Sequence, residues 1–255
     1  MSRFAGGWLS KRDIQSGARM RLFCLPHAGS GAAGFYRWRQ LLPAGVDVCP
    51  VWLPGREVRL AEPSLQDATA LVDQLIAVAE PYLDVPFALF GHSMGALLAY
   101  EFAVRLQAAR LRGPEWMFVS GREAPHLPFV HRELYRLGDE AFVAELRRRY
   151  GGMPEGFLAD AELREVFLPI LRADLRLVES YRHGERPLLR CPIDAFAGKS
   201  DSSVSDDGLA AWVTLTTGAF AWRRLPGDHF FHAGPGQPEL LRLISERLRP
   251  FCLRV

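Results

Sequence analysis

The chain has 255 residues, of which 49% are apolar and 24% charged, and its formal net charge at neutral pH is +2. This length allows a sizeable core and suits one α/β domain, with or without an insertion. The small net charge gives no reason to expect a nucleic-acid partner. No apolar run approaches the ~20 residues of a membrane span and no signal-peptide pattern occurs, so we expect a cytoplasmic protein without membrane contact.

Short apolar runs with the residue types of buried strands recur along the chain. They are Arg21–Leu25, Val46–Leu53, Phe87–Phe90, Trp116–Ser120, Pro192–Ala197 and Phe220–Leu225. Helical patterns separate most of them, and the clearest one, over residues 65–82, begins with an S-x-x-D capping signal at Ser64 and Asp67. Strands alternating with helices predict an α/β fold with a mostly parallel sheet covered on both faces.

One long connection breaks this alternation. About 70 residues separate the fourth and fifth predicted strands, and they contain helical patterns over 139–150 and 163–181, the second with Pro169 inside it. A connection of this length is more typical of an inserted element than of a plain loop. We therefore predict a core made of residues 1–124 and 190–255, with a helical lid inserted at 125–189 above the site. Helices that only pack on the core are the alternative.

The stretch FALFGHSMGALLAYEF, residues 87–102, places Ser93 between two glycines where a strand passes into a helix. In such a G-x-S-x-G turn the serine hydroxyl is held above the edge of the sheet. The backbone N–H of Met94 begins the helix, where the helix dipole favours negative charge. The turn thus predicts Ser93 as a nucleophile and Met94 as an oxyanion donor, although so short a pattern also occurs by chance.

A serine nucleophile requires a base and an acid that orients the base. His229 lies on a glycine-containing loop after the last predicted strand, and Asp201 follows the preceding strand. Sites in parallel sheets form on loops at the carboxyl ends of strands, and proteins with this turn have the chain order Ser, Asp, His. We predict Asp201 as the acid and His229 as the base, with His232 as the substitute.

Other acid and base candidates fit less well. His92 belongs to the serine turn and should point away from Ser93, Asp194 lies within a strand, and Asp228 is too close in sequence to His229 to brace its ring. Asp174 lies on the apolar stripe of the second helix of the inserted region, an unusual place for a carboxylate. We expect Asp174 to pair with a nearby arginine.

The loop LPHAGSG, residues 25–31, follows the first predicted strand, and the N–H of Ala28 is the expected second oxyanion donor. A phosphate-binding loop is not predicted, because no Gly-Lys-Ser/Thr follows at the required spacing, and a dinucleotide fingerprint is absent. The cysteines are too widely spaced for metal ligands, so buried thiols are predicted for Cys24, Cys49, Cys191 and Cys252.

Five ordered segments together resemble the type II thioesterases, the stand-alone editing hydrolases that accompany polyketide synthases and nonribosomal peptide synthetases. They are PHAGSG at 26–31, LPGREVRLAEP at 53–63, GHSMG at 91–95, GKSD with Val204 at 198–204 and PGDHFF at 226–231. The resemblance extends from about Leu22 to Phe251, with Ser30 standing where many members have glycine. It implies an α/β-hydrolase with Ser93, His229 and Asp201 as the triad and the amides of Ala28 and Met94 as the oxyanion hole.

The same resemblance implies a substrate and a partner. The substrate is an acyl group on the phosphopantetheine thiol of an acyl carrier or peptidyl carrier protein, and no metal or further cofactor is required. Such carriers are acidic, so Arg147 and Arg148, or Arg182 and Arg186, are candidate contacts, with a solvated helix face as the alternative. We expect a monomer, because no dedicated interface is evident.

Other functions of the same triad remain open at this stage. A lipase or carboxylesterase acting on oxygen esters would use the same residues, and a protein can retain such a fold without turnover. We do not expect a chain-releasing cyclase domain, because no carrier domain precedes residue 1.

Overall fold

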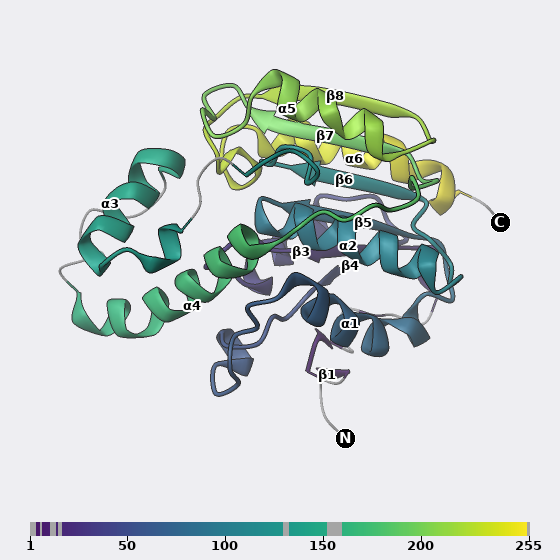
Figure 1. Cartoon of the computed structure of the whole chain (residues 1–255). Helices are drawn as coiled ribbons and strands as arrows, with labels where there is room; N and C mark the ends of the chain where they lie inside the picture. Colours follow the sequence, from purple (N-terminus) through teal and green to yellow (C-terminus); the bar gives the residue numbers. More distant parts are fainter. Residues whose placement is uncertain are drawn as a thin grey trace.

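The computed structural model describes residues 4–5, 7–10, 14, 17–129, 133–151 and 160–253. Its centre is a six-stranded parallel sheet with the order β4-β3-β5-β6-β7-β8 (Figure 1). The strands are β3 (Met20–Leu25), β4 (Val46–Pro50), β5 (Phe87–His92), β6 (Trp116–Ser120), β7 (Ile193–Gly198) and β8 (Phe220–Leu225). All six predicted strands are therefore confirmed. A small antiparallel pair, β1 (Phe4–Ala5) with β2 (Leu9–Ser10), was not predicted.

Helices cover both faces of the sheet, as predicted. One face packs on α1 (Ala68–Ala79) and α2 (Met94–Ala108), and the other on η1 (Ala32–Gln40) and α6 (Gln237–Cys252). Alternation of side chains across a strand explains why Phe23 and Leu25 join the first core cluster while Leu22 and Cys24 join the second. The remaining short helices are α5 (Asp206–Ala210), η2 (Glu57–Arg59), η3 (Glu80–Tyr82), η4 (Leu134–Arg136), η6 (Ala211–Leu215) and η7 (Phe231–Ala233).

The start of α1 corrects one detail of the sequence prediction. The helix begins at Ala68, and its N-cap is Asp67, whose carboxylate accepts the N–H of Ala70 at 2.7 Å. The pattern beginning at Ser64 therefore gave the wrong capping residue. The backbone of Asp67 is extended, with φ −126°, so no helical turn can include the residues before it.

Two helices of the long connection, α3 (Asp139–Tyr150) and α4 (Ala161–Ser180), lie together to one side of the sheet (Figure 1). Both match predicted helices, and α4 continues through Pro169. They share a small apolar cluster of their own, formed by Phe142, Val143, Leu146, Leu168, Leu175 and Leu134. The bounds 125 and 189 for a separate lid stay a prediction.

All four cysteines are buried and none of them forms a disulfide bond, which confirms the prediction of core thiols. Burial raises the pKa of Cys24 well above its usual value and that of Cys191 to about 12. Neither thiol therefore has the ionised form that nucleophilic attack requires.

Within the described residues, no helix has both the length and the apolar character that crossing a membrane demands.

Candidate active site

Ser93 sits at the turn between β5 and α2 in a strained backbone conformation. Its φ of 54° and ψ of −112° lie outside the regions that non-glycine residues normally occupy. Its backbone N–H donates to the carbonyl oxygen of Ser120 on the neighbouring strand β6, at 2.7 Å. The turn thus holds a half-exposed serine at the N-terminus of α2, as the sequence predicted.

The two glycines of the turn are required by close packing of backbone on backbone. A Cβ on Gly91 would overlap the carbonyl oxygen of Gly95, and a Cβ on Gly95 would overlap that of Leu25 at the end of β3. Both positions therefore accept only glycine without a shift of the chain. This packing brings the start of α2 against the end of β3, and so places Ser93 next to the loop that contains Ala28.

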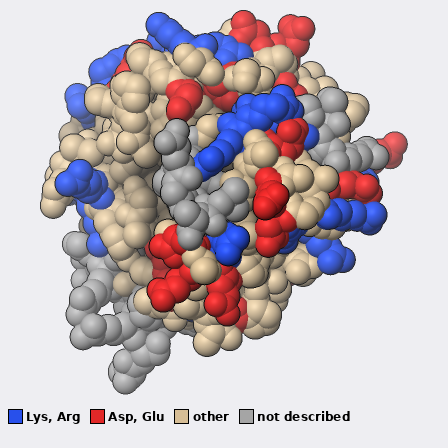
Figure 2. All heavy atoms as spheres, turned by 90° about the vertical axis from the view of Figure 1, so that its left-hand side faces the viewer, with Lys and Arg blue, Asp and Glu red and all other residues tan. Residues whose placement is uncertain are grey.

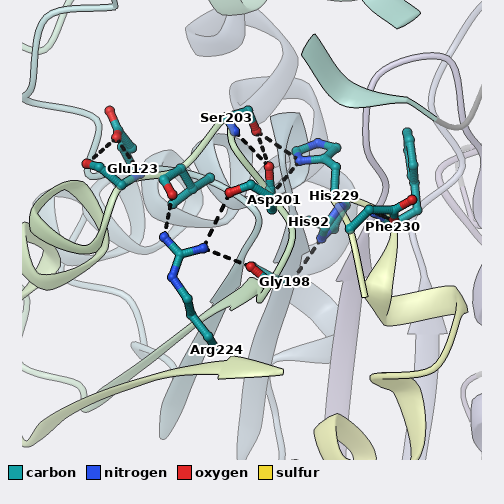
Figure 3. Close-up of polar contacts among 12 residues, drawn as sticks. His92, Glu123, Gly198, Asp201, Ser203, Arg224, His229 and Phe230 are labelled. Atoms are coloured by element: carbon teal, nitrogen blue, oxygen red, sulfur yellow. Dashed lines mark hydrogen bonds and ion pairs between the residues drawn. The ribbon is translucent and has the colours of Figure 1, made fainter. Parts of the chain in front are cut away.

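His229 and Asp201 form a buried hydrogen-bonded pair. His229 follows β8 and Asp201 follows β7, and the His229 Nδ1 donates to Asp201 Oδ2 at 2.8 Å (Figure 3). Each residue is 4% exposed. Because Nδ1 is turned to the carboxylate, the opposite ring nitrogen, Nε2, remains for a hydroxyl in the cavity that Ser93 and His229 both line.

Two residues that the sequence analysis missed hold this pair in place. Ser203 donates its backbone N–H (3.0 Å) and its hydroxyl (2.5 Å) to Asp201 Oδ1. Arg224 of β8 donates to the carbonyl oxygens of Gly198 and Val204, on either side of Asp201 (Figure 3). The Asp-x-Ser spacing is a known side-chain turn pattern and was a usable signal for Ser203, whereas nothing local marked Arg224.

The pKa of Asp201 reflects two opposing effects. Burial is the largest and by itself would raise the pKa of the carboxyl group. The hydrogen bond and charge of His229, with the hydrogen bonds from Ser203, outweigh burial and hold the pKa of Asp201 below its usual value. The carboxylate is therefore ionised at neutral pH and can stabilise a protonated imidazole.

Three further histidine rings lie close to that of His229 and to one another. His92 stacks on His232 with ring centroids 3.8 Å apart, and His27 lies 5.6 Å from His232. Burial lowers the pKa of His92 and His232 well below the usual value, and lowers that of His27 to about 4. His232 Nδ1 is buried without a hydrogen-bond partner among the described residues. This environment favours His229, not its substitute His232, as the base.

The two predicted oxyanion donors lie on the same cavity as Ser93. Met94 is the first residue of α2, and Ala28 lies on the loop after β3. Within the described part of the chain, neither backbone N–H donates to a backbone or side-chain acceptor. Both remain free for an oxygen held above Ser93.

Two cavities meet at Ser93. The first, of about 390 Å³, is mainly apolar, and its walls include Leu146, Tyr150, Leu171, Leu175 and Val178 of α3 and α4. The second, of about 550 Å³, has polar and apolar walls in about equal share, and its polar side chains include Glu123, His126, Arg148, Arg149, Arg182, His183, Ser202 and Ser203. Ser93, Arg122, Tyr150 and Val178 line both. The site thus offers a mainly apolar chamber and a more polar one, called the polar chamber below, and both are lined by Ser93.

Arg122 and Tyr150 are further site residues that the sequence analysis did not identify. Arg122 lies two residues after the end of β6, so its place at the carboxyl end of a strand beside β5 was a usable signal. Burial lowers the pKa of Arg122 and raises that of Tyr150. The Tyr150 ring lies 4.8 Å from that of His229, and its position depends on how α3 packs, which sequence spacing does not reveal.

The arginines considered for carrier binding have different surroundings. Arg148 and Arg182 line the polar cavity, whereas Arg147 lines neither cavity. Arg186 pairs with the buried carboxylate of Glu101. Figure 2 shows the face on the α3 side of the molecule, where a contiguous stripe of Lys and Arg is bordered by Asp and Glu.

Asp174 pairs with Arg56, which confirms the prediction that it binds an arginine. Among the described residues, no group of three or more His, Cys, Asp or Glu side chains could hold a metal ion.

Comparison with known proteins fits this geometry. Residues 20–248 match the family model described as the thioesterase domain. The chain belongs to the thioesterase family. It is 39% identical over 242 residues to the gramicidin S biosynthesis protein GrsT of Aneurinibacillus migulanus, covering 95% of this chain and 94% of GrsT.

Solved structures place this thioesterase among the type II members. RedJ, the thioesterase of the prodiginine pathway in Streptomyces coelicolor, superposes with a TM-score of 0.85 at 40% identity, covering 91% of this chain and 86% of RedJ. The type II thioesterase BorB from the borrelidin cluster superposes with a TM-score of 0.83 at 36% identity, covering 95% and 96%. The fold is that of the α/β-hydrolase thioesterases, as the sequence predicted.

Proposed function

We propose that this thioesterase removes aberrant or short acyl groups from the phosphopantetheine arms of acyl or peptidyl carrier proteins, and so edits a polyketide or nonribosomal peptide synthase. The observation that carries the proposal is that Ser93 and His229 line one mainly apolar cavity while His229 is hydrogen-bonded to Asp201, in a chain of the thioesterase family. The arm belongs to the carrier, so the enzyme itself needs no cofactor.

The proposed reaction uses Ser93 as nucleophile. His229 Nε2 takes the proton of the hydroxyl as Oγ attacks the thioester carbonyl, while Asp201 keeps the ring in the required tautomer and stabilises the imidazolium. The negative oxygen is held by the N–H groups of Ala28 and Met94, each contributing roughly 3 kcal/mol to transition-state stabilisation. The thiol leaves with the proton from His229. Water, deprotonated by the same histidine, then releases the acid from the acyl-serine.

The two cavities suggest how the substrate is divided. The acyl group fits the apolar chamber below α3 and α4, whose volume of about 390 Å³ favours a small to medium group. The pantetheine arm carries amides and a terminal phosphate, which suit the polar chamber with its arginines. The scissile carbonyl then lies at Ser93, where the chambers meet.

The carrier itself is proposed to dock beside the polar chamber. Arg148 belongs to α3, and its side chain is 65% exposed while contacting Glu145. Arg182 follows α4 and lines the same chamber. Acidic carriers would meet these two residues first, whereas Arg186 is less available because its side chain is only 19% exposed and pairs with the buried Glu101. Arg147 remains a weaker candidate, since it lines neither chamber.

The test is hydrolysis of acetyl- or propionyl-loaded carrier protein, followed by intact-mass spectrometry of the carrier. We expect the wild type to remove the acyl mass and Ser93→Ala to leave it, with a rate loss of roughly 10⁶-fold. Survival of the acyl group with both proteins would contradict the proposal. Matched oxygen esters then decide whether the same triad serves a carboxylesterase.

A further inference from the structure

A buried ion pair connects helix α4 to the loops around the active site. Arg56 donates to both carboxylate oxygens of Asp174, at 2.6 and 2.7 Å. Arg56 is 5% exposed and Asp174 2% exposed. Removing two charges from water costs several kcal/mol unless they are well paired, so this contact requires α4 and the loop at Arg56 to keep one relative position.

The same carboxylate also holds the loop that supplies the proposed oxyanion donor. The backbone N–H of Gly29 donates to Asp174 Oδ2 at 2.8 Å, and Arg56 donates to the carbonyl oxygen of Ser30 at 3.0 Å. Gly29 is the residue next to Ala28. Asp174 and Arg56 therefore fix the peptide units that directly follow the Ala28 amide.

Close packing reinforces these hydrogen bonds. Leu171 lies one turn before Asp174 on α4, and a Cβ on Gly29 would overlap the Leu171 side chain. Gly29 also has a φ of +75°, which favours glycine. Leu171 and Leu175 line the apolar cavity together with Ala28. One face of α4 thus touches both the acyl chamber and the loop that bounds it.

The other end of this loop is held by the neighbour of Arg56. The Glu57 carboxylate accepts the N–H groups of Ala32 and Ala33 at 2.8 and 3.0 Å. Its own backbone has a φ of 50°, an uncommon conformation for a residue with a side chain. Charged side chains from outside therefore hold the loop at both ends, so its shape depends on those contacts.

We propose that Asp174, together with Arg56, is a positioning residue for the oxyanion hole. By holding Gly29, it keeps the Ala28 N–H aimed above Ser93, and it makes this aim depend on the position of α4. The inference rests on the proposed function only in that Ala28 acts as an oxyanion donor. An acyl group that presses on α4 would then affect the oxyanion hole as well as the walls of its own chamber.

The main test is the double variant Arg56→Met/Asp174→Leu, because apolar replacement of both partners of a buried pair often preserves stability. We expect kcat to fall by about 10²-fold, since a small misplacement of a catalytic group costs about that much, with KM changed less than threefold. Affinity for a trifluoromethyl ketone analogue, which forms a tetrahedral adduct with an oxyanion, should fall by a similar factor. Affinity for the corresponding amide analogue should stay the same.

Asp174→Asn provides a second measurement if the double variant does not fold. The amide retains an oxygen for Gly29 but weakens the pairing with Arg56, so a roughly tenfold loss of kcat is expected, again with weaker ketone binding. Asp194→Asn is the matched control, because Asp194 is a buried carboxylate paired with Arg247 and not near Ser93. It should keep wild-type kcat.

Unchanged kcat and ketone affinity in a folded variant would overturn the proposal, as would equal losses for the ketone and the amide. Failure of the positioning role can be distinguished from failure of the proposed function. If the wild type does not hydrolyse carrier thioesters, the same variants are compared on a p-nitrophenyl acyl ester, where the positioning effect should still appear.

Discussion

The sheet and the α3–α4 region stabilise their positions by different means. Strands β3, β5 and β7 are buried along their whole length, and their contacts are mainly apolar and backbone-to-backbone, with a few polar pairs such as Asp194 with Arg247. The helices α3 and α4 share only a small apolar cluster, and Leu163, Val166 and Phe167 of α4 remain about 40% exposed. Buried charged contacts, such as the ion pair between Asp174 and Arg56, also hold α4 against the rest of the protein.

The C-terminal end of α4 is likewise held by polar contacts. The hydroxyl of Tyr181, directly after α4, donates to Glu101 of α2 at 2.5 Å. Glu179 accepts the backbone N–H of Leu134 at 3.2 Å. Directional contacts fix orientation more strictly than apolar ones, but each is lost outright when its geometry changes. The comparison therefore teaches that the sheet positions the proposed triad, whereas the walls of the apolar chamber depend on an element held at a few points.

The largest effect is expected from a substitution at the edge of the sheet. Asp201→Asn should reduce kcat by about 10⁴-fold, because the amide favours the wrong tautomer of His229 while keeping the shape of the loop. Ser203→Ala, which removes only one hydrogen bond to the same carboxylate, should cost far less. Both are measured by single-turnover hydrolysis of acyl carrier protein. Equal losses for the two variants would contradict the assignment of Asp201.

One glycine from the serine turn and one from the segment after α4 test how tightly each region is packed. Gly95→Ala should reduce the free energy of unfolding by about 3 kcal/mol or more, because its Cβ would overlap the Leu25 carbonyl. Gly184→Ala, just after α4, meets nothing within 4 Å and should change stability by less than about 0.5 kcal/mol. Urea unfolding of both variants gives the comparison. Similar midpoints would show that the serine turn is not as tightly packed as described.

The buried histidines of the core should make stability depend on pH. The folded-state pKa values of His92 and His232 lie well below the usual 6.5, so between those values the unfolded chain binds more protons. Their stabilising contribution is fully present above about pH 6.5 and is lost as the pH falls. From pH 7 to 5.5 we expect a loss of about 1 kcal/mol for each histidine. Urea unfolding of the wild type and His232→Asn checks this, since the variant should lose less.

The smallest effect concerns the surface of the helical region. Arg148→Glu should raise KM for acyl carrier protein about tenfold, or ~1.4 kcal/mol, and leave KM for a small acyl-pantetheine unchanged. Arg147→Glu, next to it but away from the polar chamber, should have a weaker effect. Steady-state kinetics on both substrates separates the cases. Equal changes on the two substrates would exclude carrier docking at Arg148.

Local sequence was sufficient for the parts of this protein that depend on nearest neighbours in the chain. The strands, α3, and the serine turn all follow from apolar periodicity and from glycines that permit backbone contact, as the match of α3 at 139–150 illustrates. The acid and base were predicted from strand order, because the carboxyl ends of parallel strands must meet at one edge. The structure then brought Asp201 and His229 within 2.8 Å.

Only the tertiary structure decided which distant side chains complete the site. Asp174 was recognised as an unusual carboxylate, but its contacts with Arg56 and Gly29 join residues 118 and 145 positions apart. Arg122 and Tyr150 reach the junction of the two cavities through the packing of β6 and α3. Sequence spacing records which face of an element a residue occupies, but not which other element packs against that face. For this protein, the sequence by itself identified the proposed triad, and long-range packing decided the shape of the chambers and the contacts that hold the loop with Ala28.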